Sequence, residues 1–349
     1  MWRPSGTIDE TYEQNIAIVR TRRHWGTLII ALSALFLLPI WGSYYLVSLI
    51  NNLSITIIAV LGLQIVTGYC GQTSFGQAAF MGVGAFASCV LVMKGGFSFW
   101  LAMPVAGLIS GVCGLVGGAP SLRIKGLYLA VATFAIHFLI MWLIFHLDFL
   151  GGPRGLSVTP PKIGSFYFDT EERMFYIIIT VMLLMTYGAR NIVRTRIGRA
   201  FVAVRDNDLA AQVMGYNIFY YKMLSFFIAC FYAGVAGSLW AHLIKVVYAE
   251  QFTLMNSIYY IGMVIVGGLG SIPGVFFGVL FIRIIDELMI FASPVLSKTF
   301  PWMGQAPAAA LSLTTFGAVI ALFLILEPRG LAHRWEIIKA STRLYPFAR

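Results

Sequence analysis

The sequence predicts an all-α polytopic membrane protein, a bundle of about 8–10 transmembrane helices with broken or re-entrant segments. Hydrophobic residues make up 59% of the 349 residues and charged residues only 11%, whereas a soluble domain carries roughly 25% charged residues. Several stretches contain no Asp, Glu, Lys or Arg, and the longest runs from His24 to Met93. A transmembrane helix needs about 20 mostly apolar residues, so these stretches are long enough to cross a bilayer.

The predicted elements follow in order along the chain. Residues 1–26 form an amphipathic segment, because Thr7 and Glu10 fit a helix-capping box before apolar residues at helical spacing; a disordered tail is the alternative. Residues 27–327 form the transmembrane domain. Its spans are expected near 27–41, 44–66, 74–93, 98–119, 127–147, 173–189, 223–244, 257–282 and 308–327. A shorter stretch at 285–300 is a tenth crossing, a surface helix or a re-entrant helix, and residues 328–349 form a tail.

Basic residues indicate the orientation of these spans. Lys and Arg gather before the first span, in the 188–222 connection and after the last span. The positive-inside rule predicts that these three segments, and therefore both termini, are cytoplasmic. The acidic 148–172 connection is then the outer, periplasmic loop. Topology accounts for the net charge of +10, so no nucleic-acid partner is expected.

Small residues at four-residue spacing predict close helix packing. Such residues let helices approach each other in lipid, where apolar burial gives no drive to associate. The pairs are Ala78 with Gly82, Gly84 with Ser88, Gly107 with Gly111, Gly114 with Gly118, Gly234 with Ser238, and Gly274 with Gly278.

Two stretches depart from simple helix. Gly68 to Phe80 (GYCGQTSFGQAAF) and Gly267 to Gly274 (GGLGSIPG) place Gly, Pro and hydroxyl-bearing residues within the membrane, one in each half of the chain. Broken helices at corresponding positions of two halves indicate a transport pathway in transporter folds. Tight interfacial loops are the alternative interpretation.

The 188–222 connection contains a candidate docking helix. A polar cluster at 206–208 can cap a helix over Leu209 to Met214 that ends at Gly215. A helix of two turns is unstable alone in water, so it must dock on something. Its apolar residues suit a protein groove, and Arg199 and Arg205 suit acidic contacts. A connector whose arginines meet anionic lipid is the alternative.

Catalytic and energy-coupling motifs are missing from the sequence. There is no G-x-x-x-x-G-K-[ST] phosphate loop and no metal-ligand spacing of histidines. Arg283, Asp286 and Glu287 follow the 257–282 span and are interpreted as a neutralised pair at a helix end rather than a proton relay. With so few charges deep in its spans, the protein is either a passive conduit or takes its energy from a partner.

Six motifs together resemble the LivM-type permeases of ATP-binding-cassette importers for branched-chain, hydrophobic amino acids. They cover roughly Leu46 to Arg329 in the order typical of that family: GYCGQTSFGQAAFMGVGAF, IKGLYLAVATFA, GGPRGL, GRAFVAVRDNDLAAQVMGYN, AGVAGSL and GGLGSIPGVFFG. The resemblance implies a permease in the bacterial inner membrane that is not itself an enzyme and binds no cofactor, while partner subunits use ATP. It implies a LivH-type second permease, two cytoplasmic ATPase subunits and a periplasmic solute-binding protein as partners, besides membrane lipid.

The resemblance also assigns roles to residues. Asp208, Ala210, Ala211 and Gly215 match the family's acidic-Ala-Ala-x-x-x-Gly coupling motif, with Leu209 between the acid and the alanines and Asp in place of the more usual Glu. Together with Arg199 and Arg205 they form the expected ATPase-coupling set. The expected translocation set lies in the two broken stretches: Gln72, Ser74, Gln77, Gly267, Gly268, Gly270 and Ser271.

The substrate stays open at this level. Branched-chain amino acids are expected, but importer permeases of the same architecture carry urea, short amides or aromatic acids. A passive channel or facilitator for a small neutral solute is the alternative from a different functional class, and a membrane scaffold is disfavoured by the broken helices.

Overall fold

A computed structural model describes residues 22–121, 126–164, 166–299, 307–327 and 329–344. The amphipathic segment predicted for residues 1–26 lies almost entirely outside the described residues. Thirteen α-helices run through the described part of the chain: α2 (Arg22–Trp41), α3 (Tyr44–Leu63), α4 (Gln77–Met93), α5 (Phe99–Ser121), α6 (Leu127–His146), α7 (Glu171–Arg194), α8 (Arg196–Asp206), α9 (Asp208–Val213), α10 (Ile218–Ile244), α11 (Leu254–Gly267), α12 (Ile272–Thr299), α13 (Pro307–Leu326) and α14 (Gly330–Leu344).

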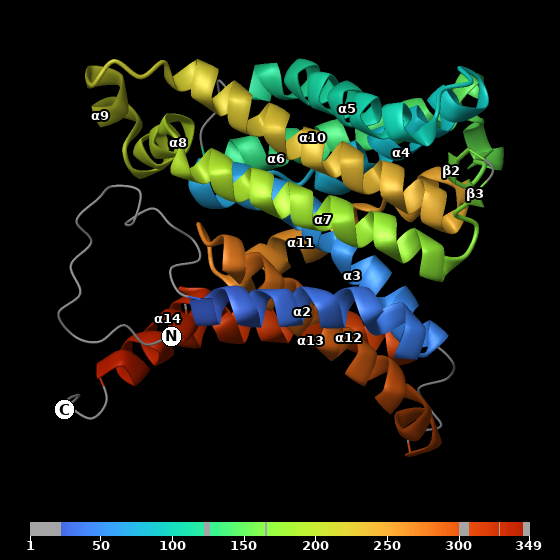
Figure 1. The fold of residues 1–349 in the computed structure, drawn as a ribbon. Coiled ribbons are helices and arrows are strands. Elements are labelled where there is room, and N and C mark those ends of the chain that lie inside the picture. The colour runs from blue at the N-terminus through green and yellow to red at the C-terminus, as the bar shows by residue number, and fades with distance from the viewer. Residues whose placement is uncertain (1–21, 122–125, 165, 300–306, 328, 345–349) are drawn as a thin grey trace.

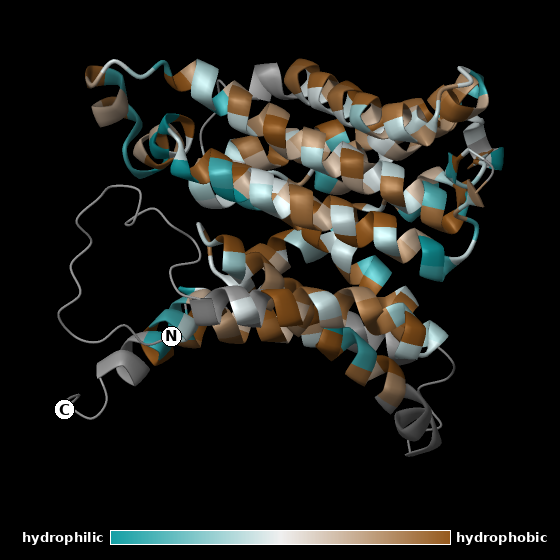
Figure 2. Cartoon of the chain, in the orientation of Figure 1, coloured by the Kyte–Doolittle hydropathy of each residue, from teal (hydrophilic) through white to brown (hydrophobic). Residues whose placement is uncertain are grey.

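The long helices run side by side as a bundle (Figure 1). Hydrophobic residues dominate their middles and hydrophilic residues are more frequent toward their ends (Figure 2). Among the described residues, five helices are long and apolar enough to cross a membrane, and a sixth crossing results if the bent pair α11 and α12 is one span. Three shorter apolar helices, at 29–41, 77–93 and 314–323, add to these. The predicted all-α polytopic membrane fold is confirmed.

Short strands and 3-10 turns occupy one end of the bundle. Helices α8, α9 and α14 lie at the opposite end (Figure 1). Strand β1 pairs antiparallel with β4, and β2 pairs antiparallel with β3. The segments at this end are η2 (Asp148–Leu150), η3 (Gly152–Arg154), β1 (Leu156–Ser157), β2 (Lys162–Ile163), β3 (Phe166–Tyr167), β4 (Val246–Val247) and η4 (Ala249–Gln251). The predicted 148–172 loop therefore contains one hairpin, β2 with β3, and a strand, β1, that pairs with β4 after α10; we call this end of the bundle the hairpin end.

Helix α10 is the centre of the tightest packing, which we call the core: α4, α5 and α10. It begins where the Asn217 side chain accepts a hydrogen bond from the Tyr220 amide, which caps the helix. A Cβ added at Gly84 of α4 would overlap the backbone of Gly234, and one at Gly237 would overlap the Met81 carbonyl oxygen. The close helix packing predicted from the small residues is confirmed here, because the backbones touch where glycines lie.

Polar side chains add crosslinks between the helices of the core. Ser238 of α10 donates to Ser88 of α4 at 2.8 Å, and Ser110 of α5 donates to the Phe80 carbonyl at 2.8 Å. Hydrogen bonds of this kind contribute on average about 0.6 kcal/mol each in a membrane protein. They therefore fix the register of helices whose association depends mainly on close packing.

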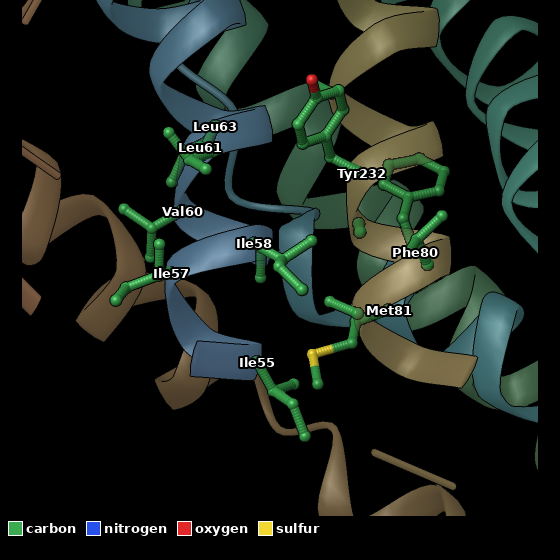
Figure 3. Close-up of a cluster of buried hydrophobic side chains, with 14 of the residues drawn as sticks. Ile55, Ile57, Ile58, Val60, Leu61, Leu63, Phe80, Met81 and Tyr232 are labelled. Atoms are coloured by element: carbon green, nitrogen blue, oxygen red, sulfur yellow. The ribbon is translucent and has the colours of Figure 1, made fainter. Parts of the chain in front are cut away.

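Helix α3 lies between the core and the helices of the second half. Ile55 and Ile58 point toward α4, where Met81 and Phe80 lie (Figure 3). Ile57 and Val60 point to the other side (Figure 3), and both are buried. A helix that is apolar all round is buried on all sides, and α3 fits that description over this stretch.

The predicted 257–282 span is two helices, α11 and α12, bent by 119° at a break between Gly267 and Ile272. The break lies within the predicted stretch Gly267 to Gly274, so that departure from simple helix is confirmed. The prediction of a separate element at 285–300 is wrong, because α12 continues to Thr299. The predicted tail at 328–349 contains α14, whose first residue, Gly330, lies against Gly268 in the break.

Candidate functional site

Helix α8 connects the predicted docking helix to the bundle. It begins after Thr195, ends at Asp206 and buries Gly198, Ala200, Phe201 and Val204 on one face. Its other face is charged and exposed, and Arg199 lies there. Because apolar residues recur at helical spacing, α8 lies flat against α7 and α10. The 188–222 connection is thus shorter than predicted, since α7 extends to Arg194 and α10 starts at Ile218.

Helix α9 is the predicted docking helix, and both of its ends are capped. The Asn207 side chain accepts hydrogen bonds from the Leu209 and Ala210 amides at 3.0 and 3.1 Å. At the other end Gly215 has a φ of 89°, and the Tyr216 amide donates to the Ala211 carbonyl at 3.0 Å. That bond and the left-handed glycine form a Schellman cap, which requires glycine for its positive φ.

One face of α9 is anchored and the other is open. Ala211 is buried, and Asp208 forms an ion pair of 3.0 Å with Lys222 of α10, both side chains being largely buried. Leu209, Val213 and Met214 are 71%, 89% and 76% exposed, and Ala210 is exposed as well. Three large apolar side chains on a two-turn helix form a surface that fits a groove on another protein.

The first broken stretch starts as a π-helix, η1 (Gln64–Tyr69). Such wide turns occur frequently at functional sites. The Gln64 side chain is fully buried and its Nε2 donates to the carbonyls of Gly268 at 2.9 Å and Ser271 at 3.1 Å. One amide therefore joins the break in the first half of the chain to the break in the second half.

Arg205, the last-turn arginine of α8, joins the same place. Its guanidinium donates to the Gly68 carbonyl at 3.0 Å and pairs with Asp206 at 2.9 Å. A Cβ added at Gly270 would lie 3.1 Å from the Arg205 guanidinium, and one at Gly68 would lie 2.6 Å from the Gly270 amide nitrogen. We call this meeting point the junction: Gln64, Gly68, Arg205, Gly268, Gly270 and Ser271.

The predicted translocation residues divide into two groups. Gly268, Gly270 and Ser271 belong to the junction, and Gly267 approaches Gly274 so closely that a side chain would overlap its carbonyl. Gln77 is buried and donates to the Ala59 carbonyl at 2.7 Å and the Ala229 carbonyl at 3.3 Å, so it crosslinks three helices.

Gln72 and Ser74 lie in the loop between η1 and α4, and both are buried. Ser74 accepts a hydrogen bond from the Gly76 amide at 3.4 Å. Both side-chain polar atoms of Gln72 have no hydrogen-bond partner among the described residues. Burying an amide without hydrogen bonds costs folding free energy. Among the predicted translocation residues, Gln72 is thus the one whose side chain keeps its donors and acceptor unused within the described part of the chain.

Two cavities lie elsewhere in the bundle. The first, of about 390 Å³, lies between α3, α11 and α12, and Arg283 and Asp286 are among its lining residues. The second, of about 630 Å³, lies at the hairpin end beside Asp169 and Lys245. Both cavities are lined by Asn52 and Trp240. None of the seven predicted translocation residues lines either of them.

Sequence reasoning missed one residue that the structure makes prominent and misplaced two others. Gln64 lies in an apolar run, and an amide between Leu63 and Ile65 was the available signal. Arg283 and Asp286 were interpreted as lying at a helix end. The helix-end part of that interpretation is wrong, because α12 runs on to Thr299 and both residues lie in its middle, whereas a charge pair is present between Arg283 and Glu287 at 3.6 Å.

Comparison with known proteins supplies a family. Residues 45–326 match the family described as branched-chain amino acid transport system, permease component. The chain is 28% identical over 302 residues to the high-affinity branched-chain amino acid transport system permease protein LivM of Salmonella typhimurium, covering 79% of this chain and 67% of that protein.

Two relatives from Methanocaldococcus jannaschii are 24% identical to the chain. The probable branched-chain amino acid transport permease protein LivM matches over 85% of this chain and 92% of its own length. The probable LivH protein matches over 82% of this chain and 91% of its own length. No solved structure matches the chain.

Proposed function

Since this chain belongs to the family of branched-chain amino acid transport permease components, we propose that it is the membrane permease subunit of an ATP-binding-cassette importer for branched-chain amino acids. It forms part of the pathway through the bilayer and has no ATPase activity of its own. ATP is bound and hydrolysed by partner subunits.

A second permease, two ATPase subunits and a solute-binding protein complete the transporter. Similarity to both a LivM and a LivH protein supports a pair of related permeases, with this chain as the LivM-type member. The ATPase subunits dock on the exposed apolar face of α9, at the end where α14 also lies (Figure 1). The solute-binding protein docks at the hairpin end.

The orientation follows from the same two ends. The end with α8, α9 and α14 carries the basic residues of the 190–205 stretch and of the chain after Glu327, which supports its placement on the cytoplasmic side. Both termini are then cytoplasmic, and the hairpins face the periplasm across a bacterial inner membrane.

The observation that carries the proposal is the reach of Arg205 from the docking segment into the junction. A displacement of α9 moves α8, because the two helices are consecutive and packed together. Arg205, at the end of α8, holds the Gly68 carbonyl, and Gln64 in the same π-helix holds both ends of the second break. A displacement of α9 is therefore transmitted to both broken stretches through the side chains of Arg205 and Gln64. Closure of the ATPase subunits can thus move the elements of the translocation pathway as rigid bodies.

The test is transport by the reconstituted complex. The chain is purified with its partner permease and ATPase subunits, inserted into liposomes that enclose ATP, and supplied outside with the binding protein and tritiated leucine. The proposal expects leucine to accumulate above its outside concentration, and only with ATP and a hydrolysis-competent ATPase.

Other outcomes would contradict parts of the proposal. Equilibration of leucine without ATP would indicate a passive facilitator. ATP-driven accumulation of urea or of an aromatic acid in place of leucine would keep the importer and change its substrate. Purification without any ATPase chain would overturn the assignment of an importer.

A further inference from the structure

We propose that the cavity between α3, α11 and α12 binds a small dipolar solute, with Arg283 and Asp286 of α12 receiving its negative and positive ends. The inference rests on the transport function proposed above and adds the place where the solute binds within this chain. The cavity measures about 390 Å³, which is in the range of small-molecule sites.

The position of the two charges is the first argument. Arg283 lies 11 residues after the first residue of α12, so it is roughly 16 Å along the helix at 1.5 Å per residue. Arg283 and Asp286 therefore lie in the body of α12 and are partly buried, close to Glu287, which contacts Tyr45 in the first turn of α3. Partly buried charges on a membrane helix are costly and mark substrate or ion pathways.

Their incomplete pairing is the second argument. Arg283 pairs with Glu287 at 3.6 Å, a long contact, and its Nε is buried without a hydrogen-bond partner. Asp286 forms no hydrogen bond or ion pair with any side chain in the described part of the chain, although Arg283 is only three positions away on the same helix face. Asp286 therefore lines the cavity without a side-chain partner, and the Arg283 guanidinium, which lines both this cavity and a neighbouring apolar groove, is held only by the long contact to Glu287.

Glu287 occupies a different environment from Asp286. It accepts a hydrogen bond from the Tyr45 hydroxyl and lines an apolar groove with Tyr45, Leu49 and Leu280. Of the two adjacent carboxylates, only Asp286 lines the cavity. The pair thus supplies a matched control on one helix.

The remaining lining fits a zwitterion with an aliphatic side chain. Asn52 and Asn256 provide amide groups, and Leu53, Ile55, Met263 and Val279 provide apolar surface. Sites for small molecules combine a mostly apolar wall with a few placed polar groups. A cation, an anion and an aliphatic wall in one cavity match a neutral amino acid better than urea, which carries no formal charge.

Access comes from the hairpin end. The larger cavity of about 630 Å³ meets this one at Asn52 and Trp240, which line both. A solute released at the hairpin end would pass Trp240 to reach Arg283 and Asp286.

The inference is tested by measuring leucine binding to the permease complex itself, in the absence of the solute-binding protein and its own selectivity. Tritiated leucine is bound to the purified complex of permeases and ATPases in detergent, with no binding protein present. Competition uses 4-methylpentanoate, which lacks the ammonium group, and 3-methylbutylamine, which lacks the carboxylate. The variants are Asp286→Asn, Arg283→Gln and, as control, Glu287→Gln, each checked for intact assembly with its ATPase subunits.

We expect Asp286→Asn and Arg283→Gln each to weaken leucine binding about tenfold or more, because each removes a charge-assisted hydrogen bond. Asp286→Asn should also reduce the preference for leucine over 4-methylpentanoate, and Arg283→Gln the preference for leucine over 3-methylbutylamine. A merely structural role would not lower a different one of these two preferences in each variant. Glu287→Gln removes the contact to Arg283 but leaves Asp286 in place, so it should keep the preference for leucine over 4-methylpentanoate unchanged.

Three results would overturn the inference: no leucine binding by the assembled complex, unchanged affinity in both cavity variants, or equal losses in all three variants. In each case the transport proposal is judged separately by ATP-driven leucine uptake of the unmodified complex. Uptake that persists would place the solute elsewhere, whereas absent uptake would remove the proposed function itself.

Discussion

In the core, α10 meets α4 and α5 backbone to backbone, whereas at the junction a short backbone contact is supplemented by two long side chains. Gly84 and Gly234 touch without any side chain between them, so a relative shift of these helices would force atoms into each other. At the junction, Gly68 also lies against the Gly270 backbone, but Gln64 and Arg205 add three hydrogen bonds to carbonyls. Close-packed interiors resist deformation, while long side chains can follow a displaced partner. We therefore expect the junction to deform more readily than the core.

The largest expected effect comes from breaking the core. Gly237→Leu places atoms where the Met81 carbonyl oxygen lies, and overpacking against backbone costs about 3 kcal/mol or more. We expect no folded complex to be recovered, measured by size-exclusion chromatography of the detergent extract.

A matched control uses the same substitution at a lipid-facing glycine. Gly317 of α13 has no atom within 4 Å of an added Cβ, so Gly317→Leu should leave the yield of monodisperse complex unchanged. If the Gly237→Leu complex is recovered in normal yield, the core tolerates a large side chain at this contact, and the proposed difference between the core and the junction is wrong.

The next effect is on coupling. Arg205→Gln removes a charged donor from the Gly68 carbonyl, a bond of about 1.5–3 kcal/mol, so ATP-driven leucine uptake should fall about tenfold while the protein still folds. Basal ATP hydrolysis should persist, because the ATPase subunits keep their own sites.

Arg196→Gln is the control, since Arg196 is exposed at the start of the same helix and carries the same charge. Uptake should stay close to that of the unmodified complex. If both variants lose uptake equally, the surface charge of α8 matters rather than the link to the junction.

The third effect separates two buried glutamines of the first break. Gln64→Leu leaves the Gly268 and Ser271 carbonyls without their donor, which costs about 1–3 kcal/mol per group. Thermal unfolding of the complex should therefore shift down by several degrees, at roughly 2–4 °C per kcal/mol. Gln72→Leu removes an amide that has no partner among the described residues, so it should not lower the unfolding temperature.

Leucine uptake by the two variants provides a second measurement. If Gln72 contacts the solute, Gln72→Leu should slow leucine uptake without loss of stability. Equal destabilisation by both substitutions would mean that the Gln64 bridge does not hold the breaks together.

Much of this architecture follows from residue patterns, and the reasons for the failures are physical. The glycine spacing in α10 predicts its close packing because small residues act through their immediate neighbours on one helix face. The cap residues Asn207 and Gly215 predict the ends of α9 because capping is local. The bond from Arg205 to Gly68 joins residues 137 positions apart, and no local pattern reports such a distance.

The charges of α12 show a different limit. A charged triplet after an apolar run has the pattern of a helix end in the membrane, and that interpretation truncated the span before Arg283. The helix in fact continues: Arg283 and Asp286 line a cavity, and Glu287 accepts a hydrogen bond from Tyr45. The same charged residues can therefore mark a helix end or lie inside a helix, and their packing against other helices decides between the two.

The smallest expected effect comes from the cap of α9. Gly215 has a φ of 89° with open space around it, so Gly215→Ala adds only the strain of a left-handed alanine, about 1–2 kcal/mol. That cost falls on the Schellman cap, and hydrogen exchange of residues 208–217 should speed up several-fold. ATP hydrolysis should then be stimulated less by substrate.

Gly96→Ala is the control, because Gly96 has a φ of 65° and equally open surroundings in the turn between α4 and α5. It carries the same strain outside α9 and should leave the stimulation unchanged. If substrate stimulates ATP hydrolysis equally in both variants, a destabilised α9 still couples the ATPase subunits to the permease. The rigidity needed for coupling would then depend on α8 and Arg205 alone.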